Sequence, residues 1–231
     1  MHNDRSATLQ PLVDDLRRVF GDRLQAVVAY GWRHPGPVPN LALVGSLTIE
    51  DLNACAAKSG AWHRAGAATP LLLTPSDFAR SLDAFPIEFG DILANHDVVF
   101  GRDPFEGLAV RPEDLRRACE VQAKSHLLHL REDYLEAGGR PSTVEILVRD
   151  SAPAFAALLR QLARLDGEPG ITHADLVIYA KRRVGLDAHV VGDVLSLADA
   201  EGVPAVDAVK LFPAYLTSME QLAAFVDRWR V

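Results

Sequence analysis

The chain has 231 residues, of which 48% are hydrophobic and 24% charged, and its formal net charge is −7. This composition is typical of a globular protein and excludes a disordered or fibrous chain. Acidic residues outnumber basic ones in both halves of the chain. A basic surface for a nucleic-acid backbone is therefore not expected.

The two cysteines, Cys55 and Cys119, form no Cys-x-x-Cys pair. Neither a disulfide framework nor a thiolate zinc site is expected from them. The first residues lack the apolar core of a secretion signal, and no stretch reaches the roughly 18 apolar residues that a bilayer span requires. We therefore expect a cytoplasmic protein that has no membrane partner.

Residues 1–106 alternate helical and strand patterns, which predicts an α/β domain with a small mixed sheet. The loop over residues 31–40 contains two glycines and three prolines, so it is predicted to be irregular. Thr48 with Asp51, and Thr74 with Asp77, are typical of helix N-termini. In chain order, the patterns predict a helix ending at Gly21, strands over residues 24–30 and 41–44, a helix over residues 48–62, a strand over residues 71–73, a helix beginning at Thr74, and strands over residues 86–92 and 98–100.

From residue 112 onward the pattern changes to long helices, which predicts an all-α helical-bundle domain over residues 112–231. Pro153 is predicted to break or kink the second of these helices near its first turns. The helices are predicted over residues 112–137 and 143–165, from Thr172 with Asp175, after Asp187 as a cap, and over residues 204–229 with Pro213 inside.

Several segments carry a resemblance to a known superfamily. They include Tyr30-Gly31 at the end of a predicted strand, the Gly/Pro-rich loop that follows, the run Phe85-Pro-Ile-Glu-Phe89, and Leu127-Leu-His-Leu-Arg131. On these segments the chain resembles bacterial nucleotidyltransferase-domain proteins of the DNA polymerase beta-like superfamily. The resemblance is closest to aminoglycoside nucleotidyltransferases, in which a small catalytic domain precedes a helical substrate-binding domain.

The resemblance also implies where a catalytic site would lie. In that superfamily the first strand ends in Gly-Ser, and the next strand carries two acidic residues, separated by one position, that hold two magnesium ions. Here the Gly-Ser position is Gly31-Trp32, and the acidic positions hold Asn40 and Ala42. Asparagine offers one neutral oxygen and alanine none, so no metal site is expected and the motif is interpreted as degenerate. Magnesium and ATP are expected as cofactors only if the chain is active.

Seven other residues are candidates if some activity or binding remains. Glu120 and Lys124 match a base and a phosphate-contacting lysine of aminoglycoside nucleotidyltransferases, but an i,i+4 Glu-Lys pair is also common on helix surfaces. The candidate catalytic carboxylates are Glu88, Asp91 and Glu120, and the candidate nucleotide-binding residues are Gly31, Arg33, Gly36 and Lys124.

Two further patterns carry weaker hypotheses. His126 and His129 lie three residues apart on a predicted helix, but two imidazoles without a third ligand make a weak metal motif. Arg183 and His189 fit the permissive Arg-x4-6-His spacing of helical ribonucleases. Glycine and aspartate lie between them and indicate a loop, whereas that family places the pair on a helix.

Three functions stay open at this point. The favoured interpretation is a catalytically inactive nucleotidyltransferase-like protein with a binding or regulatory role, whose small-molecule or nucleotide ligand enters the inter-domain cleft. The first alternative is an active enzyme that moves a nucleotide from ATP to a small hydroxylated acceptor. The second is a structural or interaction protein.

Overall fold

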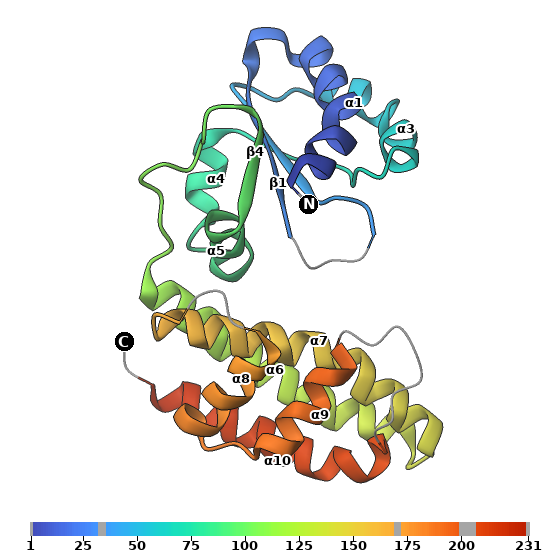
Figure 1. The fold of residues 1–231 in the computed structure, drawn as a ribbon, viewed down its shortest axis with the longest axis vertical. Helices are drawn as coiled ribbons and strands as arrows, with labels where there is room; N and C mark the ends of the chain where they lie inside the picture. The colour runs from blue at the N-terminus through green and yellow to red at the C-terminus, as the bar shows by residue number, and fades with distance from the viewer. Residues whose placement is uncertain (1, 32–35, 169–171, 199–206, 230–231) are drawn as a thin grey trace. The chain divides into compact units, whose positions relative to one another are not determined.

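The computed structural model describes residues 2–31, 36–168, 172–198 and 207–229, and the chain forms two compact units, Met1–Arg111 and Pro112–Val231. The first unit contains a sheet with helices, and the described part of the second unit is helical (Figure 1). This architecture confirms the predicted fold class, an α/β domain followed by an all-α bundle.

A four-stranded mixed sheet forms the centre of the first unit. Strand β1 pairs antiparallel with both β2 and β4, and β2 pairs parallel with β3. In the β1–β2 register, Ala29 lies opposite Asn40 and Val27 opposite Ala42. Because side chains alternate along a strand, these four residues share one face of the sheet. The strands, in the order β3-β2-β1-β4, are Leu71–Leu73, Asn40–Val44, Leu24–Tyr30 and His96–Gly101.

Helices cover both faces of this sheet (Figure 1). Ala42 packs on one face with Leu12 of α1 and Trp62 of α3, whereas Leu41 packs on the other face with Phe78 of α4. Burial on both faces explains why β1 and β2 read as continuous apolar runs. The helices of the first unit are α1 (His2–Phe20), α2 (Ile49–Ala56), α3 (Ser59–Arg64), α4 (Pro75–Ser81) and α5 (Pro86–Ala94).

The predicted helix starts at Thr48 and Thr74 are confirmed. The hydroxyl of Thr48 accepts a hydrogen bond from the Asp51 amide at 3.3 Å, and that of Thr74 accepts one from the Asp77 amide at 3.1 Å. Each aspartate carboxylate in turn accepts a hydrogen bond from the threonine amide. Both pairs therefore form capping boxes, which satisfy amides that have no partner inside the helix.

The prediction of a strand over residues 86–92 is wrong, because this segment is helix α5. Pro86 occupies the first turn, where its fixed backbone angle suits a helix and no amide is lost. Phe89 and Ile92, three residues apart, are buried against the sheet, whereas Glu88 and Asp91 are exposed. A helical period, rather than strand alternation, places the apolar residues of this segment in the core.

The prediction of one helix over residues 48–62 is also wrong in part, because α2 and α3 are separate helices. The hydroxyl of Ser59 donates to the Ala56 carbonyl at 2.9 Å, which satisfies an acceptor at the end of α2. The turn itself covers residues 57 and 58, and α3 begins at Ser59. The chain therefore turns between α2 and α3, and Trp62 of α3 is buried against one face of the sheet.

The second unit is a bundle in which α7 packs against α6, α9 and α10. The helix starts predicted at Thr172 and Asp187 are confirmed, since both side chains accept hydrogen bonds from amides in the first turn. The last helix contains Pro213, as predicted, and residues 199–206 lie outside the described residues. The elements are α6 (Pro112–Ala137), α7 (Pro141–Leu165), α8 (His173–Tyr179), a π-helical turn (Ala180–Val184), α9 (Ala188–Ala198) and α10 (Ala208–Arg228).

Pro153, where a break or kink is predicted, does not break helix α7, which continues through it. Pro153 is exposed, whereas Ala152, Phe155 and Leu159 are buried on the opposite side of the helix. The proline ring therefore faces solvent, and water can satisfy the carbonyl that loses its helical partner. Apolar burial on both sides of the proline keeps the helix in one piece.

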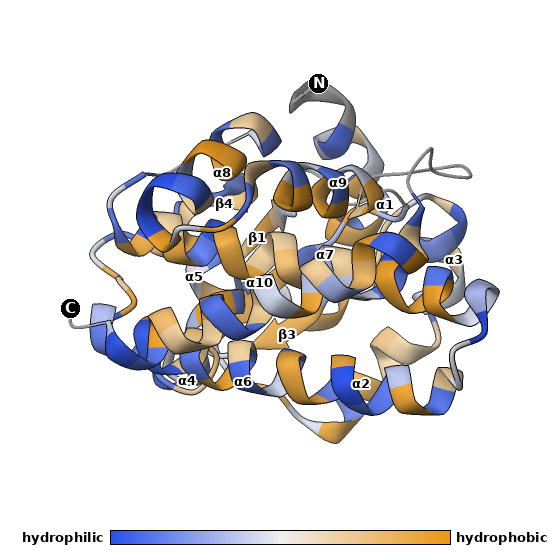
Figure 2. Cartoon of the chain, turned by 90° about the horizontal axis from the view of Figure 1, so that it is seen from below, coloured by the Kyte–Doolittle hydropathy of each residue, from blue (hydrophilic) through white to orange (hydrophobic). Residues whose placement is uncertain are grey.

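Hydrophilic and hydrophobic residues are interspersed along the helices (Figure 2). Within the described residues, no helix has both the length and the apolar character that crossing a membrane would require.

Candidate functional site

The loop after β1 holds two of the predicted nucleotide-binding residues. Gly31 has a φ of +66° and Gly36 a φ of +115°, and both values favour glycine. The Tyr30 amide donates to the Pro39 carbonyl at 3.1 Å, which closes the base of the loop. Trp32 and Arg33 lie outside the described residues.

Asn40, where the resemblance predicts the first acidic residue, is 1% exposed. Its Nδ2 donates to the Val38 carbonyl at 3.1 Å and to the Ala68 carbonyl at 2.8 Å. These bonds join the start of β2 to the segment that precedes β3. Its Oδ1 is buried and makes no hydrogen bond to any described residue. The side chain acts as a donor here, a role that an ionised carboxylate cannot fill.

Ala42, where the resemblance predicts the second acidic residue, is 0% exposed. It packs in the apolar cluster that α1 and α3 form with the sheet, next to Val27 and Trp62. Positions 40 and 42 therefore share a face that is closed by protein. This environment does not fit magnesium, which prefers hard oxygen ligands and usually one or two carboxylates.

Helix α5 presents the other predicted catalytic carboxylates of this unit. Glu88 and Asp91 are three residues apart and both exposed, so they lie on the same side of the helix. Phe89 anchors the helix, and its ring lies 4.9 Å from that of Phe78. The structure therefore brings Glu88 and Asp91 together on a firmly packed helix.

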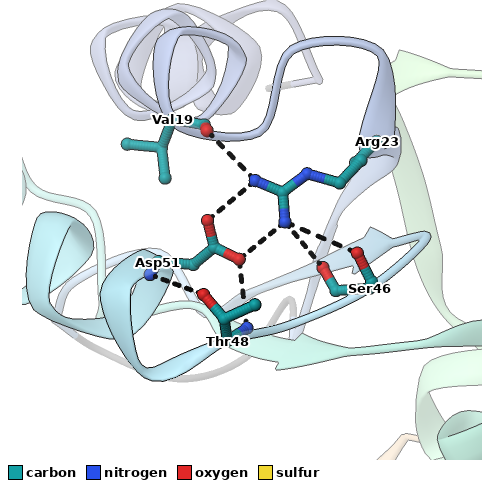
Figure 3. Close-up of polar contacts among 5 residues, drawn as sticks. All are labelled: Val19, Arg23, Ser46, Thr48 and Asp51. Carbon is teal, nitrogen blue, oxygen red and sulfur yellow. Dashed lines mark hydrogen bonds and ion pairs between the residues drawn. The ribbon is translucent and has the colours of Figure 1, made fainter.

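Sequence reasoning missed Arg23, which forms a polar network with Val19, Ser46 and Asp51 (Figure 3). Its guanidinium donates to Asp51 at 2.6 and 2.8 Å and also reaches the carbonyls of Ser46 and Val19. The guanidinium lowers the pKa of the Asp51 carboxyl to about 2. This bidentate pair joins the 3-10 turn Gly21–Arg23, which follows α1, to the start of α2. No local pattern indicates it, because the two residues lie 28 positions apart.

Glu120 and Lys124 belong to a network between α6 and α10. Lys124 donates to Glu120 and to Asp227, each at 2.7 Å, and Arg116 donates to Glu120 at 3.0 Å. The hydrogen bonds from Lys124 and Arg116 lower the pKa of Glu120. A carboxylate that is held ionised by two cations is a weak general base. This geometry favours the structural interpretation of the pair.

Neither the His126–His129 pair nor the Arg183–His189 pair forms a recognisable site. His126 bonds to the hydroxyl of Tyr215 at 2.8 Å, whereas His129, one turn further along α6, is exposed and lies 3.5 Å from Glu132. No group of three or more potential metal ligands occurs among the described residues. Arg183 donates to Asp166 at 2.8 Å and lies in the π-helical turn, whereas His189 lies in the first turn of α9.

Comparison with known proteins identifies the fold. No protein-family model matches the sequence, and no curated protein matches it. The structure is similar to that of spectinomycin adenyltransferase from Enterococcus faecialis, solved with ATP and spectinomycin. The TM-score is 0.58 at 10% identity, and the match covers 96% of this chain and 99% of that chain. The chain therefore has a nucleotidyltransferase-like fold with the two-domain layout of aminoglycoside nucleotidyltransferases.

Proposed function

We propose that this chain is a ligand-binding protein of nucleotidyltransferase fold that does not transfer nucleotides. One observation carries the proposal. The two positions that are acidic in the superfamily hold Asn40 and Ala42, and both side chains are buried. Nucleotidyl transfer depends on metal ions that orient the triphosphate and offset its charge. Neutral residues in an apolar layer supply neither ligands nor negative charge for that purpose.

The proposed ligand is a nucleotide or a small hydroxylated molecule. The support for this class is the likeness in fold to an adenyltransferase that was solved with ATP and spectinomycin. Gly31 and Gly36 have backbone angles that allow amides to approach a ligand closely. Any nucleotide bound there would be held without a magnesium bridge to β2. Its affinity should therefore depend little on magnesium.

An active transferase is the second candidate, and the exposed pair on α5 favours it. Glu88 and Asp91 lie one turn apart on the exposed side of this helix. Glu120 contributes less to this candidate, because its pKa is lowered and two cations occupy its carboxylate. Two carboxylates on one helical turn do not reproduce a two-metal site.

Nucleotide binding and transfer can be separated experimentally. The full chain is titrated with ATP by calorimetry, with magnesium or with EDTA, and then incubated with α-labelled ATP and a panel of hydroxylated acceptors. We expect the same ATP affinity in both buffers, within twofold, and no labelled acceptor. Glu88→Gln is compared with Glu50→Gln, which removes an exposed carboxylate from α2. Acceptor labelling that is lost in Glu88→Gln and kept in Glu50→Gln would refute the proposal and establish the second candidate.

A further inference from the structure

The second unit contains an open pocket of about 590 Å³ between α6 and α7, close to the turn that joins them. This volume lies within the range of small-molecule sites. Its apolar lining includes Leu130, Ala137 and Leu147, which are buried members of the bundle core, and the half-exposed Ile146. Helix packing therefore holds the base of the pocket in place without a ligand. An apolar group that enters it loses contact with water.

The rim of the pocket carries an uncompensated negative charge. Asp133 and Glu136 lie three residues apart on α6, and neither side chain makes an ion pair or hydrogen bond with any described residue. Like charges at this spacing disfavour a helix slightly. Asp150, on α7, is paired with Arg149 at 3.3 Å. Arg149 does not line the pocket, and the one permanent cation among the lining residues is Arg140, whose Nε donates to Thr143.

The imidazole of His126 also lines the pocket, and it is held in place and uncharged. The Nε2 of His126 lies 2.8 Å from the hydroxyl of the fully buried Tyr215, which sets the orientation of the ring. Burial, with a smaller effect from His129, lowers the pKa of His126 to about 4. The ring is therefore uncharged at neutral pH and does not repel a cation. His129, the other imidazole of the lining, is exposed and lies 3.5 Å from Glu132.

We propose that this pocket binds a small organic cation, with its ammonium group beside Asp133 and Glu136 and its apolar body against Leu130 and Leu147. The two carboxylates supply the charge that the ammonium requires, and the apolar base selects for a hydrocarbon part. An anion is disfavoured, because three carboxylates line the pocket against one arginine. The inference does not rest on the proposed function, because all these residues belong to the second unit.

The test uses 2-phenylethylammonium as the probe and 2-phenylethanol as its neutral counterpart. Both are titrated into the ¹⁵N-labelled full chain at pH 7.5 and low salt, and binding is followed by amide chemical shifts. We expect saturable shifts at α6 and α7 for the amine and an affinity at least fivefold weaker for the alcohol. Asp133→Asn and Glu136→Gln should each weaken amine binding about three- to fivefold, as expected for partly solvated ion pairs.

Asp193→Asn is the matched control, because it removes an exposed carboxylate from α9 outside the pocket. It should change the affinity for the amine by less than twofold. Equal affinity for the amine and the alcohol would overturn the proposal, and so would shifts that map elsewhere or an equal loss in Asp193→Asn. Ala154→Phe fills the pocket and should abolish the shifts in a variant that keeps all its charges. The ATP titration can fail without affecting any of these outcomes.

Discussion

The burial of Ala42 leads to a quantitative prediction for the substitution Ala42→Asp, which places a carboxyl group where the resemblance predicts the second acidic residue. The site is 0% exposed, and its neighbours Val27 and Trp62 are apolar. An unpaired carboxylate in such a place takes up a proton instead of staying charged. Holding an aspartic acid protonated at pH 7, against an ordinary pKa near 3.9, costs about 4 kcal/mol. Overpacking adds roughly 1–3 kcal/mol.

The total approaches the whole stability of a domain, which is about 5–15 kcal/mol. The first unit should therefore be largely unfolded, or close to it, at pH 7. The pH dependence has a definite sign. The raised pKa of the new carboxyl makes the folded state bind more protons than the unfolded state, so stability should fall by about 1.4 kcal/mol per pH unit from pH 4 to 7.

Hydrogen exchange of the amides in β1 and β2 measures this change locally, and urea unfolding at pH 4.5 and 7 measures it globally. Ala54→Asp is the control, because Ala54 is exposed on α2 and aspartate there costs under about 1 kcal/mol. A soluble Ala42→Asp variant with wild-type exchange and a new magnesium-dependent affinity for ATP would refute the reasoning. It would show that this face of β2 is open to metal.

Two other substitutions test the same structure. Asn40→Asp replaces a donor to two carbonyls by an acceptor, so we expect a loss of about 2–4 kcal/mol at pH 7 by urea unfolding, whereas exposed Asn53→Asp should cost almost nothing. His126→Gln, which can keep the bond to Tyr215, should remove the loss of folding stability that protonation of His126 causes in acid. Folding lowers the pKa of His126 to about 4. Between pH 6.5 and 4 the free energy of unfolding of the wild type should therefore fall by on the order of 2 kcal/mol relative to this variant. A constant difference between the two proteins over this range would contradict that pKa.

The sequence was most informative where one local signal dominated. Strand β1 was predicted over its observed residues, because a continuous apolar run bounded by Gly31 is typical of a buried strand. Helix α5 was missed because its short apolar segment fits both the repeat of a helix and that of a buried strand. Its helical form depends on packing between Phe89 and Phe78, which meet only in the folded unit. Tertiary contacts decide such segments.

In the candidate site, too, some features could be predicted from the sequence and others depend on the fold. The neutral chemistry of Asn40 and Ala42 was predicted from the sequence, through the resemblance to nucleotidyltransferases. Their burial was not, because it depends on α1 and α3 closing one face of the sheet. The bond from Asn40 to Ala68 also needs the parallel pairing of β2 with β3, which brings residues 28 positions apart into contact. No local pattern encodes that contact.

The apolar cover and the neutral residues on β2 depend on each other. Leu9, Leu12 and Leu16 of α1 are buried in the same cluster as Ala42, and a charged pair beneath them would lose its hydration without gaining a partner. Conversely, without a charged pair on β2, the face gains most from being closed by an apolar helix. Introducing two carboxylates at positions 40 and 42 alone therefore leaves the leucines in place. A metal site on this strand would also require polar residues in α1, so the two changes on β2 should destabilise the unit before they bind any ion.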